Sequence, residues 1–125
     1  MRLLLDTHSY LWWLTDDPSL PEAARSAITG RRAVVHVSAA SVWEISLKQS
    51  LDRVEIDAAA DLVGEIAANG FVELPISAGH ARAAADLPES LDDPFLRLLV
   101  AQAQSEGLTL VSSRPGLADR GVIVL

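Results

Sequence analysis

The sequence predicts an α/β fold with three layers, in which helices cover both faces of a central parallel sheet of about five strands. Short apolar runs alternate along the chain with longer segments of helical period, which is typical of strand-helix units around a parallel sheet. The first run, Leu3-Leu4-Leu5, shows no in-out alternation, as expected of a strand that is buried on both faces. A chain of 125 residues can build one such core, so we expect a single domain over residues 1–125.

Five strands are predicted from apolar and β-branched runs. They cover residues 2–5, 33–37, 71–76, 108–111 and 122–125. The first is expected at the centre of the sheet because it is apolar throughout. The third is expected at an edge, because Glu73 and Pro75 interrupt it and proline cannot donate a hydrogen bond to a neighbouring strand.

Six helices are predicted between these strands from apolar residues at helical spacing. They cover residues 7–14, 23–28, 38–48, 57–69, 77–87 and 93–106. Asp57 and the pair Asp93-Pro94 are start signals, because an acid can cap a helix and proline suits its first position. Gly70 and Gly107 stand where two of the helices should end.

The composition excludes several classes of function. The chain has no cysteine, which excludes a disulfide framework, a thiol nucleophile and a zinc-thiolate site and favours a cytoplasmic protein. Neither a signal peptide nor an apolar run of membrane-spanning length is present, so we expect no membrane partner. The net charge of −7 argues against broad docking on nucleic acid, so any such substrate must be held locally or through metal ions.

Three acidic residues are predicted to meet at the carboxyl ends of the strands, where open parallel sheets bind their ligands. Asp6 follows the first strand, Glu44 lies in the helix after the second, and Asp93 begins the helix that leads to the penultimate strand. Clustered carboxylates repel one another unless protons or cations neutralise them. Mg²⁺ prefers such oxygen ligands and supports phosphodiester hydrolysis without any histidine or cysteine.

Each of these acids also has a purely structural interpretation. Asp6 and Asp93 stand where an acid caps a following helix. Glu44 is three residues after Ser41, which is the spacing of a capping box. Taken singly, each acid is explained by helix capping, and only their joint position at one sheet edge favours a functional site.

The histidines and tryptophans carry weaker signals. His8, His36 and His80 lack metal-ligand spacing, and we expect His36 inside the core and His80 exposed. Adjacent residues on a helix cannot both face one core. One of Trp12 and Trp13 should therefore contribute to an apolar surface patch, which is typical of a site for a partner protein.

Several segments together resemble the PIN-domain family, and in particular its VapC-type toxins from bacterial toxin-antitoxin pairs. The matching segments, which span nearly the whole chain, are Leu3-Leu4-Leu5-Asp6-Thr7-His8, Leu11-Trp12-Trp13-Leu14, Val37-Ser38-Ala39-Ala40-Ser41-Val42-Trp43-Glu44-Ile45, Asp93-Pro94-Phe95, Arg97-Leu98-Leu99-Val100-Ala101-Gln102-Ala103 and Gly107-Leu108-Thr109-Leu110-Val111-Ser112. The resemblance implies a three-layer α/β/α PIN-like domain and an endoribonuclease that depends on Mg²⁺ or Mn²⁺. It also implies a homodimer, and a cognate VapB-type antitoxin that packs near Trp12 and Trp13.

Carried over by position, Asp6 and Glu44 match the first two metal-site acids of the family, and Asp93 matches the first residue of its Asp-Pro-Phe-Asp-Arg motif. The chain departs from the family at two positions, because Leu96 replaces the usual third acid and Arg114 stands near another expected Asp or Asn. These changes shift the local charge by about +3 at neutral pH. Metal affinity should therefore be reduced.

Three fates of Arg114 follow from this sequence. In the first, its guanidinium pairs with Asp6 or Asp93 and substitutes for the ion. In the second, Asp92 or Asp93 moves in and supports one weakly held Mg²⁺. In the third, Arg114 points to solvent, as surface arginines usually do.

Two functions remain open. One is a metal-dependent ribonuclease toxin, and the other is a catalytically inactive PIN-fold module that captures an antitoxin. A phosphoacceptor receiver domain is set aside, because its chemistry needs a lysine at the site and the single lysine, Lys48, lies within a predicted helix.

Overall fold

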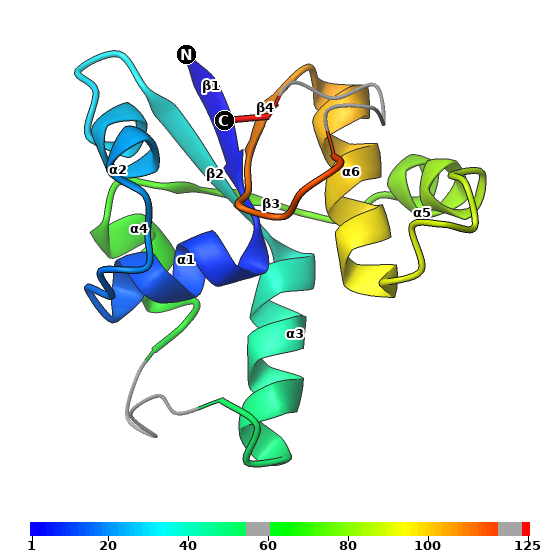
Figure 1. Ribbon diagram of the computed structural model, residues 1–125, viewed down its shortest axis with the longest axis horizontal. Helices are drawn as coiled ribbons and strands as arrows, with labels where there is room; N and C mark the ends of the chain where they lie inside the picture. The colour runs from blue at the N-terminus through cyan, green and yellow to red at the C-terminus, as the bar shows by residue number, and fades with distance from the viewer. Residues whose placement is uncertain (55–60, 118–123) are drawn as a thin grey trace.

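The computed structural model describes residues 1–54, 61–117 and 124–125, and its centre is a parallel sheet of four strands (Figure 1). The strands are β1 (Arg2–Leu5), β2 (Val34–Ser38), β3 (Val72–Leu74) and β4 (Thr109–Val111), in the order β3-β2-β1-β4. All pairings are parallel, and in the register of β1 the residue Leu4 lies opposite His36 on one side and Leu110 on the other. The predicted α/β class, the interior position of β1 and the edge position of β3 are confirmed.

The predicted fifth strand, residues 122–125, falls partly outside the described residues. Of the part that is described, Val124 forms an isolated parallel bridge with Leu110 of β4. The described sheet thus has four strands, close to the predicted five, with this bridge beyond β4.

Among the described residues, six helices flank the sheet. They are α1 (Thr7–Leu14), α2 (Glu22–Ile28), α3 (Ala39–Ser50), α4 (Gly64–Ala68), α5 (Ala78–Ala85) and α6 (Pro94–Glu106). Figure 1 shows α1, α2 and α4 on one side of the sheet and α5 and α6 on the other, while α3 extends beyond the carboxyl ends of the strands. Within the described ranges, no helix is long and apolar enough to cross a membrane.

The fourth helix is shorter than the sequence predicts. A continuous helix from Asp57 to Asn69 is wrong, because residues 61–63 are not helical and α4 begins at Gly64. The carboxylate of Asp61 accepts a hydrogen bond from the Gly64 backbone N–H at 2.9 Å, so Asp61 holds this helix start. Asp57 itself lies outside the described residues. The predicted stop is confirmed, since Gly70 follows the helix with a φ of 73°.

Side chains of β1 alternate between two hydrophobic cores, one on each face of the sheet. Leu3 and Leu5 belong to the core that α1, α2 and α4 cover, and Leu4 belongs to the core beneath α6. All three are fully buried. A strand with both faces covered needs no polar position, which explains the uninterrupted leucine run.

A buried polar network ties α5 and α6 to the sheet. Ser38 at the end of β2 donates to the Oε1 of Gln102 at 2.6 Å, and the amide of Gln102 donates to the Pro75 carbonyl at 3.1 Å. The predicted exposure of His80 is wrong, because its ring completes a capping box with Ser77 and is only 5% exposed. The network fixes α6, the helix that begins with Asp93.

Candidate active site

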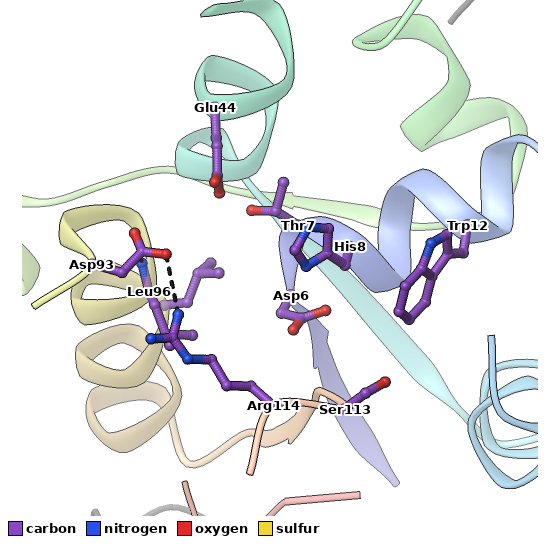
Figure 2. Close-up of a pocket in the computed structure, with 10 residues that line it drawn as sticks. Asp6, Thr7, His8, Trp12, Glu44, Asp93, Leu96, Ser113 and Arg114 are labelled. Carbon is purple, nitrogen blue, oxygen red and sulfur yellow. Dashed lines mark hydrogen bonds and ion pairs between the residues drawn. The ribbon is translucent and has the colours of Figure 1, made fainter. Parts of the chain in front are cut away.

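The three predicted acids line one cavity at the carboxyl ends of the strands. The chain runs outward from β1 to β3 and then returns to the other side of β1 to form β4, so strand order reverses between β1 and β4. A cavity of about 380 Å³ opens there (Figure 2). Its lining residues are Asp6, Thr7, His8, Trp12, Glu44, Asp93, Leu96, Leu99, Ser113 and Arg114. The predicted convergence of three distant acids is therefore present in the structure.

Asp6 is held in place at the junction of β1 and α1. Its carboxylate accepts a hydrogen bond from the Ser9 backbone N–H at 2.8 Å, which makes it the N-cap of α1. The next residue, Thr7, donates to the Ser41 hydroxyl of α3 at 3.2 Å, and the Ser9 hydroxyl donates to the Val111 carbonyl of β4 at 3.1 Å. Asp6 thus caps a helix and also faces the cavity, at the meeting point of three elements.

Glu44 projects into the same cavity from the second turn of α3. Its carboxylate is 5% exposed and forms an ion pair with Lys48, at 2.6 Å from Oε2 to Nζ. The capping-box interpretation of Ser41 and Glu44 is wrong, because α3 begins at Ala39 and its N-cap is Ser38. Helix capping therefore does not explain Glu44.

Asp93 caps α6 at the opposite wall of the cavity. Its Oδ1 accepts hydrogen bonds from the backbone N–H groups of Phe95 at 3.0 Å and Leu96 at 3.3 Å. Its Oδ2 lies 3.3 Å from the guanidinium of Arg114, the contact drawn in Figure 2. The predicted pairing of Arg114 with Asp93 is thus confirmed, and the interpretation in which Arg114 points to solvent is wrong.

Arg97 supports the segment that leads into Asp93. Its guanidinium donates hydrogen bonds to four backbone carbonyls, which are those of Ala85, Leu87, Pro88 and Leu91, at 2.7–3.2 Å. The Arg97 side chain therefore satisfies the backbone carbonyls at the end of α5 and in the turn after it. This support fixes the path of the chain toward the Asp93 cap.

Leu96 is a core residue as well as part of the cavity wall. It is 5% exposed and packs in the hydrophobic core beneath α6. Where the family pattern has an acid, the cavity of this chain therefore has an apolar wall. Leu96 therefore does more than remove a carboxylate from the cavity, because its side chain also fills part of the core.

Lys48 is the site residue that sequence reasoning missed. The Glu44-x-x-x-Lys48 spacing is the i,i+4 arrangement that stabilises helical ion pairs, and this signal was available in the sequence. With Lys48 and Arg114 included, three carboxylates face two cations, a net charge of about −1 at neutral pH. The carboxylates are thus largely neutralised by the chain itself.

The three carboxylates are the kind of ligand that a divalent cation prefers, but two of them already form ion pairs with cations of the chain. Carboxylate oxygens are the ligands that Mg²⁺ prefers. Across residues 1–54, 61–117 and 124–125, however, no three His, Asp or Glu side chains lie close enough together to hold an ion. Lys48 and Arg114 engage Glu44 and Asp93. These cations must move aside before three carboxylates can share one ion.

The two adjacent tryptophans differ in their surroundings. Trp13 packs against Phe71 and donates from Nε1 to Asn69 at 3.0 Å. Trp12 stacks on His8, with ring centroids 5.7 Å apart and planes at 19°. Both are half-buried against the same core, so neither is fully exposed, and the contribution of one of them to an apolar surface patch stays a prediction.

The exposed tryptophan is Trp43 on α3. We find it 58% exposed and in edge-to-face contact with Phe95, at 5.0 Å between ring centroids. Tryptophan side chains are usually largely buried, and Trp43 is an exception. His36 is half-buried, and its Nδ1 lies 3.0 Å from the Leu3 carbonyl.

An acidic cavity at a point where strand order reverses defines a class of α/β domains that bind ligands at the strand ends. Comparison with protein families shows to which family of this class the chain belongs. The PIN domain family matches residues 3–117, which is most of the chain, so the protein belongs to the PIN-domain family. None of the curated proteins compared with the chain matches it.

Solved structures share this fold at low sequence identity. The chain is similar to the crystal structure of VapBC2 from Rickettsia felis bound to a DNA fragment from their promoter, with a TM-score of 0.73, 14% identity and coverage of 100% of this chain and 98% of the other. It is also similar to a toxin-antitoxin complex from Klebsiella pneumoniae, with a TM-score of 0.68, 17% identity and coverage of 98% and 96%. A third similar structure is FitAcB from Neisseria gonorrhoeae, with a TM-score of 0.63, 18% identity and coverage of 98% and 96%.

Proposed function

We propose that the protein is a VapC-type toxin, a metal-dependent endoribonuclease that hydrolyses RNA phosphodiesters. The observation that carries this proposal is the single cavity lined by Asp6, Glu44 and Asp93, which come from three distant segments. Membership in the PIN-domain family supports it. The toxin-antitoxin complexes of similar fold support the same role.

In this function, Asp6, Glu44 and Asp93 would hold one Mg²⁺ or Mn²⁺, for which their carboxylates would have to lie closer together than they do in this structure. When bound, such an ion would lower the pKa of a water molecule that it holds and would offset negative charge on the phosphodiester. Asp6 contributes a carboxylate that its own helix cap keeps in position. Arg114, once released from Asp93, can bind a phosphate oxygen through its guanidinium.

The proposed protein partners are a cognate VapB-type antitoxin and a second copy of the chain. We assign the antitoxin to the surface near Trp12 and Trp13 on α1, as the resemblance to VapC-type toxins implies. For the homodimer, α3 offers an exposed apolar row at helical spacing, made of Trp43, Leu47 and Leu51, which are 58%, 40% and 54% exposed. Such a row is typical of a helix that packs against a partner.

A second candidate function is a catalytically inactive PIN-fold module that captures an antitoxin. The two ion pairs formed by the acids of the cavity favour it, because Lys48 and Arg114 already neutralise Glu44 and Asp93. Leu96 favours it too, since an apolar side chain occupies the position of the usual third acid.

The test is cleavage of a structured RNA by purified protein with Mg²⁺, with Mn²⁺ and with a chelator. We expect weak cleavage that requires the metal and is lost in Asp6→Asn. Asparagine is also a good N-cap, so this variant should remain folded. No cleavage and no measurable metal uptake, with antitoxin binding intact, would instead support the inactive module.

A further inference from the structure

His8 and Trp12 form a stacked aromatic pair at the mouth of the acidic cavity. They stand four residues apart on α1, where side chains share one helix face. The rings lie 5.7 Å apart between centroids with an interplanar angle of 19°, so they are nearly parallel. Both residues line the cavity, and Figure 2 shows His8 between Trp12 and the acids.

Core packing accounts for Trp13 more completely than for Trp12. The indole N–H of Trp13 is bonded to Asn69, and its ring contacts Phe71 and lies 5.9 Å from the Arg25 guanidinium. Trp12 packs against the core along one part of its ring and stacks on an exposed histidine. An exposed histidine stacked on tryptophan adds little to a core, so this pair calls for a further explanation.

Trp12 also lies between two cavities. It lines the acidic cavity and a second cavity of about 470 Å³, which Arg53 and Val54 line at the end of α3 and Thr15 lines at the end of α1. A ligand that extends from the acids along α1 would therefore cross the aromatic pair. Arg53 would then offer a cation to its next anionic group, in a cavity that Asp16 and Asp17 also line, so the aromatic pair and not this cavity carries the inference.

We propose that His8 and Trp12 form a stacking site for one unpaired base of an RNA strand whose neighbouring phosphate lies at Asp6. This inference rests on the proposed ribonuclease function. One face of the imidazole is covered by Trp12, and the exposed His8 ring offers its other face to a base. Unpaired bases stack on tryptophan and histidine rings, whereas bases in a duplex already stack on each other. The site thus selects single-stranded segments and tolerates any base.

Binding can be measured apart from cleavage with a labelled single-stranded oligonucleotide that carries phosphorothioate linkages, which hydrolyse slowly. Fluorescence anisotropy in Mg²⁺ would compare the wild type with Trp12→Leu, His8→Ala and Trp12→Phe. Base-aromatic stacking predicts a loss of affinity of about fivefold or more for Trp12→Leu and His8→Ala, and a small loss for Trp12→Phe. Val72→Ala, an exposed apolar residue on β3, is the control and should bind as the wild type.

The same comparison with an abasic oligonucleotide separates stacking from a packing defect. If a base stacks on the pair, one abasic position should weaken wild-type binding and remove most of the difference between wild type and His8→Ala. Equal affinities of wild type and His8→Ala for the intact oligonucleotide would overturn the proposal. So would an equal loss for both oligonucleotides, or a loss confined to antitoxin binding. If the wild type binds no oligonucleotide at all, the ribonuclease function falls together with the stacking site.

Discussion

We expect Lys48 and Arg114 to act as internal cations that compete with a metal ion for the acids of the cavity. The double variant Lys48→Met with Arg114→Ser removes both competitors and leaves Asp6, Glu44 and Asp93 unchanged. Methionine keeps the length of the Lys48 side chain, and the Arg114 backbone can retain its bond to Ser112. We therefore expect the double variant to bind Mg²⁺ and Mn²⁺ more tightly than the wild type.

The size of the effect follows from the exposure of the two ion pairs. The Arg114–Asp93 pair is partly exposed, with side chains 44% and 32% exposed, so it contributes at most about 1 kcal/mol. The Lys48–Glu44 pair has a buried carboxylate but an i,i+4 helical geometry, which also gives about 1 kcal/mol. Together, release from both pairs is worth about 2 kcal/mol, or about a 25-fold gain in metal affinity.

Isothermal titration calorimetry with MnCl₂ measures this gain directly. Arg82→Ser is the matched control, because Arg82 forms an exposed pair with Asp86 on α5 and its loss changes the net charge as Arg114→Ser does. The control should bind the metal as the wild type does. If the double variant binds no more tightly than Arg82→Ser, the two cations do not compete with metal and the reasoning fails.

Three further predictions concern stability. Burial, with smaller effects of Glu65 and Asp61, raises the pKa of Tyr10 to about 12. The free energy of unfolding should therefore fall by at most about 2–3 kcal/mol as the pH rises from 10 to 12, because the unfolded chain loses the Tyr10 proton first. Urea titrations of a Tyr10→Phe variant should lack this fall. Leu96→Asp should cost about 2–5 kcal/mol in the same assay because it puts a carboxylate in a core, with partial recovery in MnCl₂; an unchanged midpoint would contradict this. His80→Ala should cost about 1–3 kcal/mol through lost hydrogen bonds, and an unchanged melting temperature would count against the polar network.

The features that sequence predicted well depend on local chemistry. The leucine run of β1 needs both faces covered, which places it inside a parallel sheet. Asp6 and Asp93 each stand directly before a predicted helix, and the structure has both as caps that also line the cavity. In these cases the residues within one turn determine the outcome.

The features that sequence missed depend on which elements pack together. His80 is polar and helical, yet α5 packs on α6, which brings its ring to Glu106 at 2.9 Å and buries it. Trp43 has the character of a core residue, yet α3 extends beyond the sheet and leaves it exposed. The capping box proposed for Glu44 failed because the N-cap of α3 is Ser38, three residues before Ser41. Whether a side chain is buried depends on the element that packs against it, and the residues around that side chain in the sequence do not reveal which element this is.

The most direct test of the central claim is anomalous scattering from a crystal soaked in MnCl₂. We expect one anomalous peak bounded by the carboxylates of Asp6, Glu44 and Asp93, with the Arg114 guanidinium moved away from Asp93. The contradicting result is a cavity without an anomalous peak at saturating Mn²⁺, with Arg114 still paired to Asp93.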